Sequence, residues 1–214
     1  MKKSAFIIFI AILTLGISGF GIYLLLATQS SVLGGILIGI AILLLLCVVF
    51  VYNKLVNYKN KVKESLSLVD IQLKLRFDLI PNLVETVKSY AKHEKELFAE
   101  IARIRSMAID AQNEEEKLEY ANKLVPQMKT LVAIAENYPE LKANTLFKNL
   151  MEQLVDIEDR LVSARRIYSS NVNIYNTSLQ VFPQNLIASA FDFASEPLFQ
   201  IEAGEKIVYK TEGM

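Results

Sequence analysis

The chain has little of the chemistry on which most enzymes and metal proteins depend. Its 214 residues contain one cysteine, one histidine and no tryptophan. A single cysteine, Cys47, excludes an internal disulfide. Because Cys47 lies in an apolar run, we interpret it as a small apolar side chain and not as a reactive thiol. One histidine excludes multi-histidine zinc sites and the paired Glu-x-x-His motifs of di-metal bundles, so the sequence predicts no metal and no cofactor.

Charge is also missing from the first 52 residues, which contain no acidic side chain and only two basic ones, Lys2 and Lys3. The whole chain has 23 basic and 23 acidic side chains, so the remaining part carries 21 basic and 23 acidic ones, a net charge of −2. Binding to nucleic acid needs a clustered excess of positive charge. The sequence therefore predicts no nucleic-acid partner, and it shows no motif for a small-molecule substrate.

Two long apolar runs fill this N-terminal part. Residues 5–27 and 32–52 contain no charged side chain, and TQSS, residues 28–31, lies between them. About 20 apolar residues at a rise of about 1.5 Å span a hydrocarbon core of roughly 30 Å. We therefore predict that residues 1–53 form a transmembrane helical hairpin. The alternative, a cleaved secretion signal, fits poorly because the first run is too long and Leu25 is not the small residue expected near a cleavage site.

The lysines that flank the hairpin predict its orientation. Two precede it and four follow it before the first acidic residue, namely Lys2, Lys3, Lys54, Lys59, Lys61 and Lys63. The turn between the two runs carries no charge. By the positive-inside rule both flanks lie on the cytoplasmic side. The prediction is a multi-pass protein of the inner cell membrane whose C-terminal part is cytoplasmic.

Beyond the hairpin, apolar residues recur at steps of three and four, which is typical of helices. Four such patterns follow one another, over about 54–79, 83–108, 113–135 and 139–179. Spacing of this kind predicts helices that pack side by side at shallow crossing angles, as in a coiled coil. We therefore predict an all-α fold in which residues 54–200 form an antiparallel (up-and-down) bundle of four long helices. Residues 201–214 are predicted to be a loose tail.

Three local signals bound the later helices. Asn113 and Glu116 have the spacing of a capping box, which predicts a helix start. Pro126 lies inside the third pattern, where we expect a kink or a helix end that the pattern misplaces. Pro139 opens the fourth pattern, where a proline in the first turn costs no hydrogen bond.

Pro81 makes the boundary between the first two patterns ambiguous. Its missing N–H and its steric demand disfavour an unbroken helix, yet the apolar register continues across it. One long kinked helix remains open. We favour a chain reversal at Pro81, because four helices can bury every apolar stripe. In this interpretation Asp78 and Asn82 pair with backbone groups at the corner, and Glu85 lies on the second helix.

Four separated motifs indicate a family. They are RFDLIPNLVETVKSYAKHE, AENYPELKAN, DRLVSARRIYSSNVNIYN and FPQN, in that order within residues 54–200. Together they resemble the LemA family of bacterial membrane-anchored helical proteins. The resemblance implies an antiparallel bundle of long helices behind an N-terminal membrane segment, and it brings no catalytic residues. Members usually have one membrane span, whereas two are predicted here, so the membrane topology of this chain does not follow from the family. Members also commonly have paired arginines where this chain has Leu75 and Arg76, so a role of that pair does not follow either.

The remaining candidate residues have both a structural and a functional interpretation. His93 flanks an apolar stripe and is interpreted as a helix-surface residue. Glu158, Arg165 and Arg166 are either solvated charges that pair along one helix or part of a polar layer between helices.

An aromatic repeat lies near the end of the last pattern. Tyr168 and Tyr175 are interpreted as core residues, with a docking face at the end of the bundle as the alternative. The segment 180–200 is rich in phenylalanine, but residues 167–205 carry four acids and no basic side chain. Because anionic lipid repels such a segment, we expect it to dock on the bundle or on another copy.

These observations favour a non-catalytic function. The leading hypothesis is a LemA-type scaffold, fixed in the lipid bilayer, that binds a partner protein or a second copy of itself. One alternative is a membrane-organising protein whose copies associate laterally through a G-x-x-x-G pair, Gly35 and Gly39. Another is an envelope hydrolase that uses His93, which has less support because no serine elbow or orienting group accompanies that residue.

Overall fold

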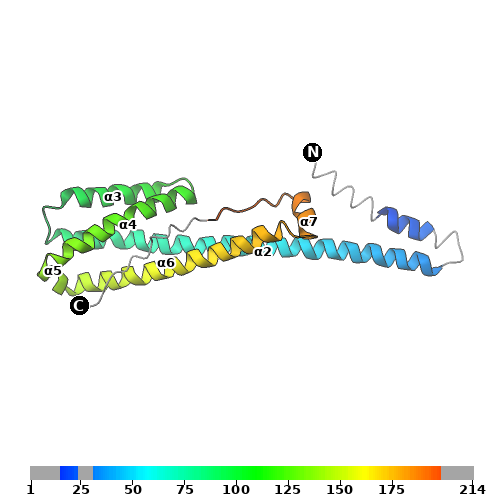
Figure 1. The fold of residues 1–214 in the computed structure, drawn as a ribbon, viewed down its shortest axis with the longest axis horizontal. Coiled ribbons are helices and arrows are strands. Elements are labelled where there is room, and N and C mark those ends of the chain that lie inside the picture. The colour runs from blue at the N-terminus through cyan, green and yellow to red at the C-terminus, as the bar shows by residue number, and fades with distance from the viewer. Residues whose placement is uncertain (1–14, 24–30, 199–214) are drawn as a thin grey trace. The chain divides into compact units, whose positions relative to one another are not determined.

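The computed structural model describes residues 15–23 and 31–198, and these residues form helices and connecting segments without a strand (Figure 1). Residues 15–23 are helical. The longer part contains α2 (Ser31–Lys88), α3 (Lys95–Asp110), α4 (Glu114–Glu136), α5 (Pro139–Ala143), α6 (Thr145–Ser178) and α7 (Gln184–Ala190). The predicted all-α class is confirmed. The predicted tail, residues 28–30 of the predicted turn and the ends of the first predicted span lie outside the described residues.

The chain divides into two compact units. Of the described residues, those up to Glu64 and Tyr168–Leu198 belong to the first unit, and Ser65–Ile167 belong to the second. Helices α2 and α6 contribute residues to both. Arg76 of α2 lies beside Glu158 of α6, and Lys61 lies beside Asn171, so α2 and α6 run antiparallel. Helices α3 and α4 pack in the same way (Figure 1), and antiparallel packing of long helices is confirmed.

The core of the second unit is built from the apolar stripes of α2, α3, α4 and α6. Each stripe contributes side chains that are fully or almost fully buried at helical spacing. They include Val69, Leu73, Ile80, Leu83, Ile101, Ile104, Leu124, Met128, Leu131, Phe147, Leu154 and Leu161. In α4 the buried residues recur at steps of three and four, as the apolar pattern predicted, and they include Leu118, Ala121 and Ala135 beside the three named above.

Pro81 lies inside α2, so the favoured prediction of a chain reversal at this residue is wrong. Helix α2 runs from Ser31 to Lys88 and unites the second predicted membrane span, the first predicted bundle helix and the start of the next. Asp78 and Asn82 consequently occupy no corner and are exposed on the helix. The alternative that the apolar register left open, one long helix, is the observed one.

One contact between helices explains how α2 continues through the proline. Because Pro81 has no N–H, the carbonyl oxygen four residues earlier, that of Phe77, loses its donor within the helix. Nε of Arg105, on α3, donates to this oxygen at 2.6 Å. The acceptor that the proline leaves free is thus paired by a charged side chain from the neighbouring helix, as buried backbone groups require.

The chain reversal takes place at residues 89–94 instead. The N–H groups of Tyr90 and Ala91 both donate to the carbonyl of Val87, at 3.0 and 2.9 Å, and close the last turn of α2. Nδ2 of Asn144, just before α6, donates to the Tyr90 hydroxyl at 3.0 Å. Because this turn contains neither proline nor glycine, its sequence carries no ordinary turn signal.

The predicted start of α4 is confirmed. Oδ1 of Asn113 accepts a hydrogen bond from the N–H of Glu116 at 2.8 Å, and the Glu116 carboxylate accepts one from the N–H of Gln112 at 3.0 Å. The reciprocal pair satisfies two N–H groups that have no partner within the helix.

The other two prolines differ in their outcome. Pro126 lies inside α4, so this helix does not end there. Pro139 does begin a helix, but this is the short α5, and the last long helix, α6, starts at Thr145. Oδ1 of Asn144 accepts from the N–H of Phe147 at 3.1 Å and supplies the first turn of α6 with an acceptor.

Within the described residues, one helix is long and apolar enough to cross a membrane. It is α2 from Gly34 onward, where mean hydropathy reaches 3.1 over 18 residues. Only 17% of that stretch is buried, as expected where side chains face lipid and not a protein core. This N-terminal apolar helix indicates a membrane anchor.

In the first unit, residues 15–23 lie close to the start of α2. A methyl group at Gly21 would approach the Gly34 carbonyl oxygen to 3.2 Å, so the two backbones are nearly in contact. A methyl group at Gly35 or Gly39 would have no described atom of another segment within 4 Å. Close packing therefore uses Gly21 and Gly34 and leaves the predicted G-x-x-x-G pair open.

The C-terminal helix α7 packs on α2 in the same unit. The buried residues of this contact are Val51, Leu55, Ile187 and Ala188. Beyond α7, the rings of Phe191 and Phe193 lie 4.9 and 5.8 Å from the ring of Tyr52, centre to centre. Residues 180–200 were expected to dock either on the bundle or on another copy. The described part of this segment packs on the chain's own helix α2.

We expect Arg105→Ala to lower the free energy of unfolding by about 1–3 kcal/mol, the cost of leaving a buried polar group unpaired. Pro81→Ala should remove most of that loss, because alanine restores an N–H to which the Phe77 carbonyl can bond within α2. The measurement is a double-mutant cycle on the full-length protein in mild detergent, with unfolding followed by circular dichroism.

The matched control is Arg103→Ala on the same helix, because Arg103 pairs with Glu100 at the surface and its removal should change stability little. An equal loss from Arg105→Ala with and without Pro81→Ala would show that Arg105 does not act through this carbonyl.

Candidate functional site

Three side chains near the end of α6 hold the main chain of a distant segment. The hydroxyl of Tyr168 donates to the carbonyl oxygen of Pro197 at 3.0 Å, and the hydroxyl of Tyr175 donates to that of Ala194 at 3.0 Å. The Asn176 amide bonds twice to Glu196: Nδ2 donates to its carbonyl at 2.8 Å, and Oδ1 accepts from its N–H at 3.0 Å. We call Tyr168, Tyr175 and Asn176 the tyrosine–asparagine site.

Helical spacing brings the three residues together. Tyr168 and Tyr175 are seven residues apart, so they lie on one face of α6, and Asn176 follows directly. The segment that they hold comes after α7, which is fixed on α2. Asp192 has φ of 52°, a left-handed conformation that aspartate tolerates better than most residues. It turns the chain out of α7 and into the segment 193–198.

Burial gives the two tyrosines a shared electrostatic property. Tyr168 is 2% exposed and Tyr175 is fully buried. Desolvation raises the pKa of both hydroxyls, and the Glu196 carboxylate raises each pKa further because it disfavours a second negative charge nearby. Both hydroxyls therefore stay protonated and able to donate. The two interpretations of Tyr168 and Tyr175 were core residues and a docking face. Their burial agrees with the first.

A second polar cluster lies inside the second unit. Arg76 is 1% exposed, and its Nε lies 2.9 Å from Oε1 of Glu158. The two atoms form a close ion pair although the N–H does not point along the line that joins them, and Nη2 of Arg76 has no hydrogen-bond partner among the described residues. An arginine this deeply buried is tolerated only beside an opposite charge.

The other charges of the predicted polar layer separate into two groups. Nη2 of Arg165 donates to Oδ1 of Asn122 on α4 at 3.1 Å, whereas Arg166 is exposed. The ammonium of Lys117 on α4 bonds to the carboxylate of Asp70 on α2 and so links these two helices. The structure thus brings Glu158 and Arg165 between helices and leaves Arg166 outside, and a functional role for these residues stays a prediction.

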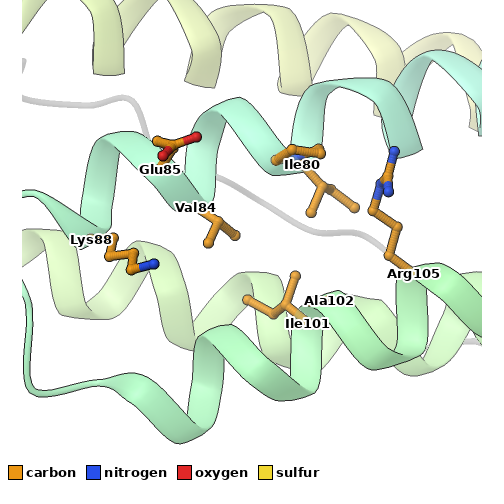
Figure 2. A pocket seen from close by; sticks show the side chains of 8 residues that line it. Ile80, Val84, Glu85, Lys88, Ile101, Ala102 and Arg105 are labelled. Carbon is orange, nitrogen blue, oxygen red and sulfur yellow. The ribbon is translucent and has the colours of Figure 1, made fainter.

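The residues around Pro81 line a shallow hollow of 260 Å³ between α2 and α3 (Figure 2). Its floor is apolar, with Ile80 and Ile101 among the lining residues, and its charged groups are Glu85, Lys88 and Arg105. His93 lies outside it, exposed in the turn after α2. Of the residues predicted here, only Pro81 and Glu85 share a site. The arginine of this hollow is already bonded to the carbonyl oxygen of Phe77.

Sequence reasoning missed four residues that make these contacts: Arg76, Arg105, Asn122 and Asn176. For two of them a signal existed. Arg76 occupies a position of the apolar stripe, which marks a buried charge in need of a partner. Pro81 inside a continuous register implies that a donor must reach the freed carbonyl. Nothing in the local sequence distinguishes Asn122 or Asn176 from an exposed asparagine.

The raised pKa values predict an alkaline transition. The stability that the two tyrosines contribute is complete below the ordinary tyrosine pKa of 10.0 and is lost as the pH rises through the raised values. In a tyrosinate absorbance titration we expect two hydroxyls to titrate later in the folded than in the urea-unfolded protein. Tyr168→Phe and Tyr175→Phe should each remove one of them. The prediction is wrong if both proteins titrate alike.

Comparison with known proteins gives the family. The model of the LemA family matches residues 65–211. The chain is 24% identical over 164 residues to Protein LemA of Metamycoplasma hominis, and this match covers 74% of each of the two chains. It is 22% identical over 175 residues to magnetosome protein MamQ 2 of Paramagnetospirillum magneticum, and the match covers 70% of this chain but only 64%, less than two thirds, of that relative. Because the family model matches well over half of its residues, the chain belongs to the LemA family.

Proposed function

We propose that this protein is a non-catalytic scaffold, anchored in the inner membrane by a multi-pass N-terminal segment, whose cytoplasmic helices bind a protein partner. The observation that carries the proposal is the continuity of α2: one helix contains the apolar residues suited to a membrane and, from residue 65 onward, the residues that pack in the second unit. The lysines between Lys54 and Lys63 support the orientation.

An exposed apolar face on α2 supports partner binding. Leu68, Ile71 and Leu75 are 42%, 49% and 45% exposed, although they lie in the second unit and beyond the apolar anchor. Steps of three and four residues place them on one face of the helix. A row of large apolar side chains outside the core is typical of an interaction surface. We therefore place the partner contact on this face.

The test substitutes Ile71. A photo-reactive amino acid at Ile71 should cross-link a protein of defined mass in intact cells. Ile71→Glu should lower recovery of that protein by on the order of tenfold, since loss of a central apolar contact costs about 1–2 kcal/mol. Because Ile71 is exposed, the variant should fold normally by circular dichroism.

Asn82→Glu is the matched control, as it adds the same charge at an exposed position on the same helix, about 16 Å beyond Ile71 and outside the apolar row. The absence of any cross-linked protein or second copy from Ile71 would rule out a partner at this face.

A second candidate function is lateral self-association that organises the membrane. Its support is the open position of Gly35 and Gly39, together with relatives that are named magnetosome proteins. Closely approaching helices in lipid use small residues of this kind. The two candidates differ in the residues that they require.

We expect Gly35→Leu with Gly39→Leu to abolish energy transfer between labelled copies in vesicles. A methyl group at either position meets no described atom of another segment within 4 Å, so a loss of transfer would report contact between copies and not a disturbed chain. Gly21→Leu is the contrasting variant, since even the first carbon of its side chain would crowd the Gly34 carbonyl oxygen within one chain. Unchanged transfer in the double variant would exclude association through this pair.

A further inference from the structure

The tyrosine–asparagine site binds the main chain of the segment 194–197 through hydrogen bonds. Its four hydrogen bonds go to the carbonyl oxygens of Ala194, Glu196 and Pro197 and to the N–H of Glu196. These are groups that every polypeptide presents. Asn176 pairs with both polar groups of one residue, as an adjacent strand would in a sheet. The contacts would therefore fit other extended segments as well as this one.

The segment that occupies the site buries little of its own side-chain surface. The side chains of Ala194, Ser195 and Pro197 are exposed, and that of Glu196 is half-buried. Beneath the segment, by contrast, Tyr168 and Tyr175 are almost completely buried. Release of the segment would free two hydroxyls and one amide that can bond to a peptide, while the mostly exposed segment would lose little buried apolar surface.

We propose that the tyrosine–asparagine site binds an extended peptide segment of a protein partner, and that the chain's own residues 194–197 occupy it in the free protein. The inference rests on the proposed scaffold function, because it names how a partner is bound. The ligand must offer an N–H at the position of Glu196, so proline is excluded there. At the position of Pro197 only a carbonyl is used, so proline is accepted.

Occupancy by the chain's own segment makes binding competitive. The segment is tethered through α7, so its effective concentration at the site is high and an added peptide must displace it. Weakening the internal segment should therefore strengthen binding of the external one. A fixed structural contact would not show this inverse relation.

The experiment uses a fluorescently labelled peptide with the sequence of residues 191–198 and the full-length protein in mild detergent. Glu196→Pro in the protein removes the N–H that Asn176 accepts, so the internal segment should leave the site. Fluorescence anisotropy should show binding to this variant at least about tenfold tighter than to the unaltered protein. Adding Asn176→Ala to Glu196→Pro should abolish binding, and Asn173→Ala, an exposed asparagine on the same helix, should leave it unchanged.

Amide hydrogen exchange over residues 193–198 shows whether Glu196→Pro has released the segment. If exchange there becomes fast and the peptide still does not bind, or if it binds equally well with Asn176→Ala, the proposal is wrong. Cross-linking from Ile71 does not involve this site, so failure of the peptide test leaves the proposed scaffold function standing.

Discussion

A helix that contains proline leaves one carbonyl oxygen without its usual N–H, and the architecture of this protein depends on where that oxygen finds a donor. An interior proline costs about 3 kcal/mol. A hydrogen bond from a charged donor returns about 1.5–3 kcal/mol, which Arg105 supplies to Phe77. Continued helix also keeps Ile80 and Leu83 buried, each worth about 1.5–3 kcal/mol. Together these terms exceed the cost, so α2 continues and the reversal moves to residues 89–94.

Once α2 is continuous, polar contacts define how the other helices of the second unit align with it. Arg76 must meet Glu158, because a buried arginine without a partner costs far more than a misplaced leucine. Apolar side chains tolerate a shift of one turn, since leucine can replace leucine in the packing. A buried ion pair does not tolerate it. The pair of Lys117 on α4 and Asp70 on α2 applies the same constraint nearer the surface, where the energy is smaller.

The spacing of Asn113 and Glu116 predicted the start of α4. Apolar periodicity predicted the all-α class and the antiparallel packing of long helices, because it shows which face of each helix must be buried. It failed at Pro81, where a local rule was overridden by Arg105, 24 residues later in the sequence. It gave no sign of α5. It also suggested that Tyr168 and Tyr175 are buried but not what they bind, since hydrogen bonds to the carbonyls of Pro197 and Ala194 depend on where α7 places the chain.

Polar contacts involve three of the four motifs that indicated the family. The first contains Tyr90, whose hydroxyl accepts from Asn144, the last residue of the second. The third contains the tyrosine–asparagine site, and the fourth begins the turn into α7 that brings residues 194–197 to that site. Packing alone would favour apolar residues at these positions, because a buried polar group adds stability only when its partner is in place. The polar side chains of the motifs therefore specify which segments meet, while the apolar stripes supply most of the stability.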